Sequence, residues 1–360
     1  MIVRLPLLRP FTTSTTRRSH IEHILIKAHG NGVVGWGECA CSPEPYYCEE
    51  TTQTCWHMLK DFLAPAVLGR PWSTIEELTS FYSSVKWNNF AKAGMELACW
   101  DLLAKVEGRP LHALLGGTRR EIHSGVSLGI EESTDKLLRL VASFLDVGYR
   151  RIKLKIAPGH DVEMLKKVRE RHPDAPLMVD ANSSYSLSDL PTLRMLDDFK
   201  LMMIEQPLAH DDLLDHAKVQ EELQTPICLD ESIRTAEDAR KAIELNSCRV
   251  INIKASRLGG LLEAKRTHDL CQARGIPVWC GGMHEFGIGR AANIALCSQA
   301  GFSIPGDISG SDKYFKEDLV APPIRAIGGT VHVPDDAGLG HTPVEERIRK
   351  HAVQTLSVTS

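Results

Sequence analysis

The feature that most constrains this chain is a short apolar segment that recurs at an almost constant interval and ends in a charged residue. The segments are RIKLK, PLMVD, LMMIE, PICLD and VINIK, which end at positions 155, 180, 205, 230 and 254, so successive ends are 25, 25, 25 and 24 residues apart. Each segment is followed by a longer amphipathic stretch, as expected for a β-strand followed by an α-helix. The pattern predicts βα units and a parallel sheet.

The same interval extends in both directions along the chain. One step back leads to GVSLG near Leu128, and two steps forward lead to PVWCGG near Gly281 and FSIPGD near Gly306, which makes eight predicted strand ends. Eight buried parallel strands suit a closed (β/α)8 barrel, because closure leaves no exposed sheet edge. Helical periodicity between the strands is clearest at Thr235–Glu244, with Thr235 as N-cap, and at Leu261–Ala273.

The chain before the barrel has a different pattern. Two extended stretches flank a hairpin-type turn at His29–Gly32, and helical periodicity follows at Glu49–Leu63 and Ala91–Lys105. These features predict a small antiparallel sheet with helices. The segment Ile327–Val333 is short and extended, and we expect it to return to this part of the molecule.

The length supports two domains, because 360 residues are enough for one barrel and a smaller domain. We predict an α+β capping domain over residues 1–120 and an α/β barrel over residues 121–319. A tail from about residue 320 to residue 360 is expected to complete the cap.

Composition and charge exclude several classes of function. Lys and Arg number 42 and Asp and Glu 46, so the net charge of −4 provides no basic excess for nucleic acid. The sequence has no apolar run of about 18 residues that could span a bilayer, and its first ten residues lack a signal-peptide core. We expect a soluble cytoplasmic protein that binds neither nucleic acid nor membranes.

The ten cysteines include a group at positions 39, 41, 48 and 55. They lack the CxxC pairs of zinc ribbons, so their spacing does not favour zinc. We interpret them as reduced thiols, with a metal site in this group as the less favoured alternative.

Three predicted strand ends carry carboxylates, Asp180, Glu205 and Asp230. The C-terminal ends of barrel strands converge on one rim, where the active sites of this fold lie. Three ionised carboxylates on consecutive strands repel one another unless a cation lies between them. A ligand set made only of oxygen favours Mg²⁺ over zinc, and Mn²⁺ could substitute. The alternative is that each acid pairs with a neighbouring basic side chain.

Lysines flank this group of acids. Lys155 ends the second predicted strand and Lys254 the sixth, so the two would face each other across the barrel mouth. Metal binding to a carboxylate makes the adjacent C–H more acidic, and a lysine can remove that proton. Lys153 points to the same side of its strand as Lys155 and would lower the proton affinity of Lys155 by repulsion. The pattern predicts proton abstraction α to the carboxylate of a small molecule.

The seventh predicted strand ends in Gly281 and Gly282. Their missing side chains would leave room for substrate or, alternatively, allow a tight turn. His284 follows and could be a second base, although Lys254 already fills that role.

Together these motifs resemble the enolase superfamily, in its muconate-lactonizing branch. The matching motifs are KLK at 153–155, DAN at 180–182, IEQP at 204–207, LDES at 229–232 and NIK at 252–254. Within that branch, GGMHEFGIGRAAN at 281–293 and IPGDISGSDKY at 304–314 are similar to the o-succinylbenzoate synthase / N-succinylamino acid racemase family.

The resemblance implies a modified TIM barrel of (β/α)7β form and a capping domain whose loop around Phe11–Arg18 closes over the substrate. It implies Mg²⁺ held by Asp180, Glu205 and Asp230, and a symmetric homo-oligomer. Positions that match substrate-pocket residues of the family are Ser127, Asn182, Gly281, Gly282 and Met283.

Two activities follow from the resemblance. As a lyase, an o-succinylbenzoate synthase dehydrates 2-succinyl-6-hydroxy-2,4-cyclohexadiene-1-carboxylate with syn stereochemistry in menaquinone biosynthesis. Lys155 would remove the α proton and then help hydroxide leave, while Lys254 would stabilise the enediolate. As an isomerase, an N-succinylamino acid or N-acylamino acid racemase would use both lysines as bases, one on each face. Arg257 occupies a position linked to racemase ability, or is a solvated rim arginine.

Other interpretations fit less well. Mandelate-racemase chemistry would need an Asp where Lys254 stands. Dipeptide epimerases use an Asp-x-Asp motif at the eighth strand, where Asp307 is followed by Ile308 and Ser309. A Schiff-base aldolase would use Lys254 as its nucleophile. A non-catalytic scaffold protein would not need all of these acids and lysines.

Overall fold

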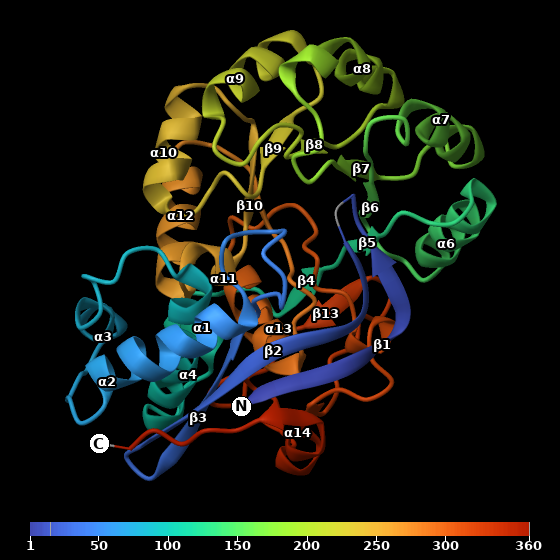
Figure 1. Ribbon diagram of the computed structural model, residues 1–360. Helices are drawn as coiled ribbons and strands as arrows, with labels where there is room; N and C mark the ends of the chain where they lie inside the picture. Colours follow the sequence, from blue (N-terminus) through green and yellow to red (C-terminus); the bar gives the residue numbers. More distant parts are fainter. Residues whose placement is uncertain (15, 360) are drawn as a thin grey trace.

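The computed structural model describes residues 1–14 and 16–359, and Figure 1 shows a curled sheet ringed by helices beside a smaller sheet-and-helix unit. The curled sheet has seven parallel strands in consecutive order. They are β5 (Val126–Leu128), β6 (Ile152–Lys155), β7 (Leu177–Asp180), β8 (Ile204–Glu205), β9 (Ile227–Leu229), β10 (Val250–Ile253) and β11 (Val278–Cys280). The predicted parallel βα units are therefore confirmed.

The eighth predicted segment closes the barrel without forming a regular strand. Phe302 forms a parallel bridge with Val278 of β11, and Gly306 forms one with Ser124. Gly306 O accepts a hydrogen bond from Gly125 N at 2.7 Å. Pro305 lies between the two bridges and has no N–H to donate, which prevents a continuous ladder there. The barrel thus has the (β/α)7β character that the family resemblance implies.

Helices cover the outside of the barrel (Figure 1). They are α6 (Thr134–Asp146), α7 (Val162–Arg171), α8 (Leu190–Met195), α9 (Leu213–Glu222), α10 (Ala236–Glu244), α11 (Ala255–Leu258), α12 (Leu261–Ala273) and α13 (Gly287–Cys297). The two helices that the sequence predicts best, α10 and α12, have the expected bounds. Thr235 caps α10 as predicted, because its side chain accepts a hydrogen bond from Asp238 N at 3.1 Å.

The second unit is an antiparallel sheet with helices packed on it. The sheet order is β15–β1–β2–β3. Its strands are β1 (Ile2–Thr12), β2 (Arg17–Gly30), β3 (Val33–Cys39) and β15 (Ala352–Gln354). The helices are α1 (Thr52–Met58), a π-helical turn (Leu59–Leu63), α2 (Ala64–Val67), α3 (Ile75–Ser80), α4 (Asn89–Val106) and α5 (Leu111–Leu114). The predicted turn at His29–Gly32 joins β2 to β3, with positive φ at Asn31 and Gly32.

Helix α4 lies directly against β3 because two glycines of the strand leave space for its backbone. A Cβ atom on Gly35 would lie 2.1 Å from Ala98 O, and one on Gly37 would lie 2.3 Å from Gly94 O. Real side chains cannot approach a backbone so closely, so glycine is required at both positions. This contact fixes the end of β3, where the chain leaves the sheet.

The tail joins both units. Strand β13 (Thr330–His332) pairs with β4 (Glu121–His123), so Ile327–Val333 meets the chain just before the first barrel strand and does not join the cap sheet as expected. Strand β12 (Val320–Ala321) pairs with β14 (Thr342–Pro343), and α14 (Glu345–His351) follows. Strand β15 pairs with β1 of the cap. None of the described helices combines the length and apolar character needed to cross a membrane.

Candidate active site

The carboxyl ends of the barrel strands bring the predicted charged residues together. Lys155 pairs in register with Asp180, and Asp180 with Glu205. The side chains of Asp180, Glu205 and Asp230 are at most 1% exposed. Lys254 follows the end of β10, so the acids lie between the two lysines along the sheet. The predicted convergence on one rim is therefore present.

Each of the two outer lysines is hydrogen-bonded to one of the acids. Lys155 Nζ donates to Asp180 Oδ2 at 2.6 Å and to Asn182 Oδ1 at 2.5 Å. Lys254 Nζ donates to Asp230 Oδ2 at 2.7 Å. Two amines thus approach the acid group from different strands, as the sequence predicts.

Lys153 lies deeper in the barrel, on the same side of its strand as Lys155. Its Nζ is 2.6 Å from Glu205 Oε2 and 2.8 Å from Asp180 Oδ2. Burial opposes its charge, but Asp180 and Glu205 outweigh burial and raise the pKa of Lys153 above the ordinary value. Lys153 is therefore a buried cation, and its effect on the proton affinity of Lys155 stays a prediction.

The three acids differ in their electrostatic environment. Burial, followed by repulsion from Asp180, raises the pKa of Glu205 to about 8. Burial also opposes ionisation of Asp230, but Lys254 and Arg257 outweigh it and lower the pKa of that carboxyl well below its usual range. Of the three acids, Glu205 is therefore the one whose ionisation its surroundings oppose.

The donor set fits a hard divalent cation. All three predicted ligands are buried carboxylates, and Glu231 adds a fourth acid beside them. Within the described residues, Glu231 Oε2 is buried and accepts no hydrogen bond, whereas Glu205 Oε2 is in an ion pair with Lys153. Oxygen ligands of this kind suit Mg²⁺ or Mn²⁺. The carboxylate oxygens of the three acids do not all lie within 4.8 Å of one another among the described residues, and basic side chains contact Asp180 and Asp230.

Arg257 is one of these basic side chains. It is 3% exposed, and its guanidinium donates to Asp230 Oδ1, to Asn252 O at 2.5 Å and to Ile233 O at 2.6 Å. The hypothesis of a solvated rim arginine is therefore wrong. The link of this position to racemase ability stays a prediction.

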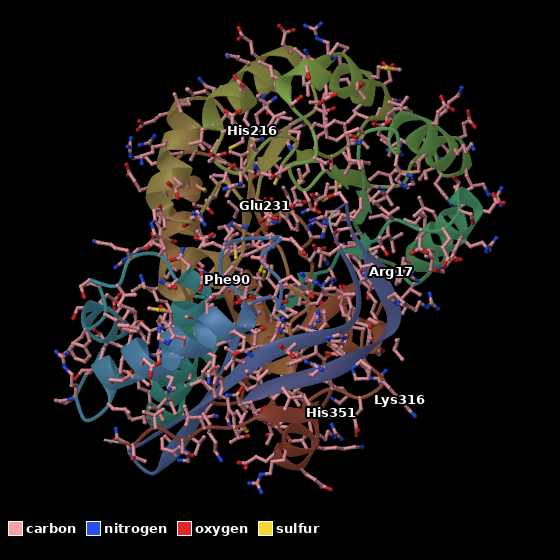
Figure 2. All side chains as sticks on the ribbon, in the orientation of Figure 1. Arg17, Phe90, His216, Glu231, Lys316 and His351 are labelled. Carbon is pink, nitrogen blue, oxygen red and sulfur yellow. The ribbon has the colours of Figure 1, made fainter. Side chains whose placement is uncertain are left out.

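A cavity of about 170 Å³ lies above the acids and is lined by both units of the molecule. Lys153, Lys155 and Lys254 line it, and so do four of the predicted substrate contacts, Ser127, Asn182, Gly282 and Met283. Glu231, labelled in Figure 2 near the centre of the molecule, also lines it. The two lysines and the predicted pocket residues therefore face one common space.

Gly281 lies against the Lys254 side chain. It does not line the cavity. A Cβ atom at this position would lie 2.4 Å from Asn252 Oδ1 and 2.6 Å from Lys254 Cε. The missing side chain of Gly281 makes room for the Lys254 side chain, and its contact with substrate stays a prediction.

The cap contributes one wall of the cavity. Phe11, Thr16 and Arg18 of the predicted closing loop line it, while Thr15 of that loop lies outside the described residues. His284 packs between the rings of Phe11 and Tyr314, at centroid distances of 4.5 and 5.2 Å. Burial, together with nearby cations such as Lys313, lowers the pKa of His284 well below the ordinary value. Its use as a second base is untested.

Tyr47 is a site residue that the sequence did not indicate, and Asp307 entered the sequence analysis only as part of an incomplete Asp-x-Asp motif. Tyr47, from the loop between β3 and α1, donates to Asp230 Oδ1 at 3.0 Å and accepts from Lys254 Nζ at 3.2 Å. No periodic pattern marks a single loop tyrosine. Asp307 accepts from Arg151 Nη2 at 2.6 Å and from Ser127 Oγ at 3.0 Å. The strand interval could have found it, because it directly follows the eighth predicted strand end.

Comparison with known proteins places this site in context. Residues 1–116 match the mandelate racemase / muconate lactonizing enzyme N-terminal domain, and residues 136–347 match the enolase C-terminal domain-like family. The o-succinylbenzoate synthase of Geobacillus stearothermophilus is 50% identical over 97% of this chain and 93% of its own length. The N-succinylamino acid racemase of Thermus thermophilus is 48% identical over 96% of this chain and 95% of its own length.

A solved structure shows the same architecture. The enolase superfamily member from Listeria innocua superposes with a TM-score of 0.95 at 40% identity, over 98% of this chain and 96% of that chain. Similarity of this extent covers both the barrel and the cap.

Proposed function

The chain belongs to the mandelate racemase / muconate lactonizing enzyme family of the enolase superfamily, and we propose that it is an o-succinylbenzoate synthase. The substrate would be 2-succinyl-6-hydroxy-2,4-cyclohexadiene-1-carboxylate, and the reaction a syn dehydration in menaquinone biosynthesis. The observation that carries the proposal is the pair Lys155 and Lys254, two buried amines that line one cavity above a group of carboxylates. The 50% identity to a synthase over nearly the whole chain supports the choice of reaction.

Lys155 is proposed as the residue that moves the proton. In a syn dehydration, the α proton and the hydroxyl group leave from the same face of the substrate. One amine on that face can therefore take the proton at Nζ and return it to the departing hydroxide. Lys155 lines the cavity together with Asn182, which holds its Nζ in place.

Lys254 is proposed to act as a fixed cation on the opposite face. Its contact with Asp230 favours the charged form, and burial makes its charge more effective in stabilising an enediolate. Gly281 provides the space for this side chain, as its neighbours show. Ser127, Asn182, Gly282 and Met283 are proposed as substrate contacts on the basis of the cavity that they line.

Metal dependence is common to enzymes of this superfamily, and we propose Mg²⁺, with Mn²⁺ as a substitute, held by Asp180, Glu205 and Asp230. The bound cation would supply positive charge for the substrate carboxylate. The burial of all three carboxylates at neighbouring strand ends, with the unpartnered Glu231 Oε2 beside them, supports this assignment.

A second candidate function is racemisation of N-succinylamino acids or other N-acylamino acids. The same two lysines favour it, because a racemase needs a base on each face of the α carbon. Relatives named N-succinylamino acid racemase, 48% and 45% identical to this chain, also support it. One site could serve both reactions.

The test is the dehydration rate of the cyclohexadiene substrate, measured as kcat/KM with Mg²⁺ and with EDTA. Fast, metal-dependent turnover supports the synthase. Slow or absent turnover by a folded, Mg²⁺-loaded protein that racemises N-succinylamino acids would make the racemase the correct assignment. Failure of both reactions would contradict the proposed function.

We also propose that the protein is a cytoplasmic homo-oligomer. The ten cysteines are all free in the structure, which fits a reducing compartment. Light scattering on the purified protein measures the oligomeric state.

A further inference from the structure

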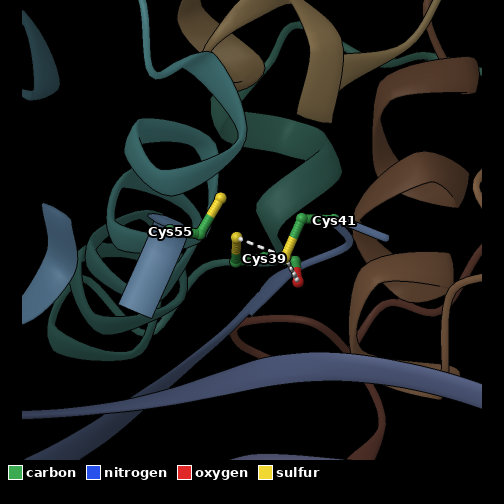
Figure 3. Close-up of side chains that lie close together, drawn as sticks. All are labelled: Cys39, Cys41 and Cys55. Carbon is green, nitrogen blue, oxygen red and sulfur yellow. Dashed lines mark hydrogen bonds between the residues drawn. The ribbon is translucent and has the colours of Figure 1, made fainter. Parts of the chain in front are cut away.

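Three thiols meet in the interior of the cap, away from the barrel rim. Cys39 ends β3, Cys41 follows it, and Cys55 lies on α1 (Figure 3). Cys39 Sγ and Cys41 Sγ are 3.6 Å apart, and all three sulfur atoms lie within 4.8 Å of one another. The three residues are at most 1% exposed. We call Cys39, Cys41 and Cys55 the thiol cluster.

The spacing of the sulfur atoms is close to that around a bound metal ion. Two thiolates on a tetrahedral zinc ion, at Zn–S distances of about 2.3 Å, stand about 3.8 Å apart. The thiol cluster needs only a small contraction to reach this geometry. Among the described residues, it is the one group of three His, Cys, Asp or Glu side chains whose ligand atoms all lie within 4.8 Å of one another.

A buried carboxylate accompanies the thiols. Cys55 Sγ donates to Glu50 Oε2 at 3.3 Å, and Glu50 is 6% exposed. Glu50 also accepts hydrogen bonds from Phe90 N and Ala91 N at the start of α4, which hold it beside the cluster. Buried thiols alone often serve as small apolar side chains. Here the Glu50 carboxylate contacts Cys55 but is not part of the group whose ligand atoms all lie within 4.8 Å of one another.

We propose that Cys39, Cys41 and Cys55 bind a thiophilic divalent cation of the zinc class, with the Glu50 carboxylate hydrogen-bonded to Cys55 beside them. Binding releases the thiol protons to solvent, and the sulfur atoms coordinate as thiolates. The cysteine spacing in the sequence does not match that of zinc ribbons. Those spacing rules do not apply here, because the three cysteines come from a strand end, a loop and a helix. The soft sulfur donors also separate it from the oxygen ligands of the barrel rim.

The position of the thiol cluster gives the cation a structural role. The loop over residues 40–51 leaves β3 at the cluster and returns to it at Glu50 and Cys55. Between these points the loop carries Tyr47 to Asp230 and Lys254 at the barrel rim. A cation in the cluster would join the two ends of this loop and restrict its motion.

The experiment is a Co²⁺ titration of the reduced full-length protein in excess Mg²⁺, which occupies oxygen sites. We expect a single Co²⁺ per chain with intense thiolate-to-cobalt charge-transfer absorption in the near ultraviolet. Absence of that absorption in the folded wild-type protein would overturn the proposal.

Two cysteine variants test whether the absorption comes from the thiol cluster. Cys41→Ala removes one of three thiolates, so the absorption at saturating Co²⁺ should fall and binding should weaken by more than roughly tenfold, the lower bound for loss of even an outer ligand partner. Cys99→Ala, at a buried cysteine of α4 in the same unit, should leave it unchanged. An absorption and an affinity that are both unchanged in Cys41→Ala would overturn the proposal. If Cys41→Ala does not fold, cadmium NMR of the wild type decides, because its shift distinguishes three-sulfur from oxygen-only coordination.

Discussion

The barrel rim and the thiol cluster are two buried groups of metal-type ligands, and they are neutralised in opposite ways. At the rim, carboxylates are ionised next to ammonium and guanidinium groups, as in the contacts of Asp180 with Lys155 and of Asp230 with Arg257. In the cap, the thiols donate hydrogen bonds, such as that of Cys55 to Glu50. They are neutral when protonated and need no counter-charge.

The difference determines what a bound cation would displace, which is a basic side chain at the rim and a proton in the thiol cluster. A cation at the rim competes with lysine side chains for carboxylate oxygens, so it leaves free amines beside a substrate. A cation in the cap replaces protons on the sulfur atoms and leaves no free base behind. The first arrangement suits chemistry, and the second suits structural support.

The largest expected effect is that of Lys155→Ala. It removes the amine proposed to move the proton, so dehydration and racemisation should both fall by about 10³-fold or more, within the range of general acid–base catalysis and its loss. The measurement is kcat/KM for both substrates. Lys254→Ala should abolish racemisation and leave part of the dehydration, because only racemisation needs two bases.

Lys167→Ala, at an exposed lysine of α7, is the matched control and should be neutral. Near wild-type turnover of either substrate by Lys155→Ala would show that the assigned mechanism is wrong.

Metal removal tests whether catalysis depends on a cation at the barrel rim or on one in the thiol cluster. EDTA treatment should reduce turnover by roughly a hundredfold or more, since charge stabilisation by a cation is worth several kcal/mol. Mg²⁺ alone should restore activity, because the rim acids are oxygen ligands. Restoration that requires Zn²⁺ would mean that the thiol cluster, and not the rim, supports catalysis.

The rim could be predicted from the sequence because its residues obey one geometric rule. Lys155, Asp180 and Glu205 end parallel strands of similar length, and parallel strands place equivalent ends on one edge. Their separation of 25 residues therefore converts directly into proximity in space. The same rule points to Asp307 after the eighth segment.

The other features of the site and the fold could not be predicted, because they depend on contacts that the regular strand interval of the sequence does not indicate. Tyr47 and the thiol cluster come from a loop and the segments that flank it, whose path is set by the packing of α4 on β3. Gly281 was predicted to make room for substrate, but only the path of the Lys254 side chain shows what occupies that room. The eighth segment forms no continuous hydrogen-bond ladder with its neighbours because Pro305 has no N–H group to donate. The apolar pattern of the sequence does not reveal this backbone effect.

Gly281→Ala tests how rigidly the rim is built. The added Cβ would lie 2.6 Å from Lys254 Cε, so the lysine must shift. A misplacement of about 1 Å can cost about a hundredfold in rate. We expect a loss between about tenfold and a hundredfold in kcat, larger for racemisation than for dehydration.

Gly30→Ala is the control for Gly281→Ala, because its Cβ would meet only the end of the flexible Leu102 side chain, at 3.1 Å. A Gly281→Ala enzyme with unchanged kcat for both reactions would contradict the proposed placing of Lys254.

Tyr47→Phe has the smallest expected effect and tests whether the two regions are connected. Burial, together with the charge of Asp230, raises the pKa of Tyr47, so its hydroxyl stays protonated and donates to that carboxylate. Loss of a hydrogen bond to a charged group costs about 1.5 kcal/mol or more, so kcat/KM should fall about tenfold. Tyr82→Phe is the control, because the buried hydroxyl of Tyr82 has no hydrogen-bond partner among the described residues.

The double variant Tyr47→Phe/Cys41→Ala completes this test. If the thiol cluster acts on the rim by holding the loop that carries Tyr47, then Cys41→Ala should cost little further activity once the hydroxyl is gone. Residues that act through one contact give such non-additive effects, whereas independent sites give effects that add. Measured kcat/KM values that multiply across the two single variants would show that the cap cluster and the barrel rim, although joined by one loop, function independently.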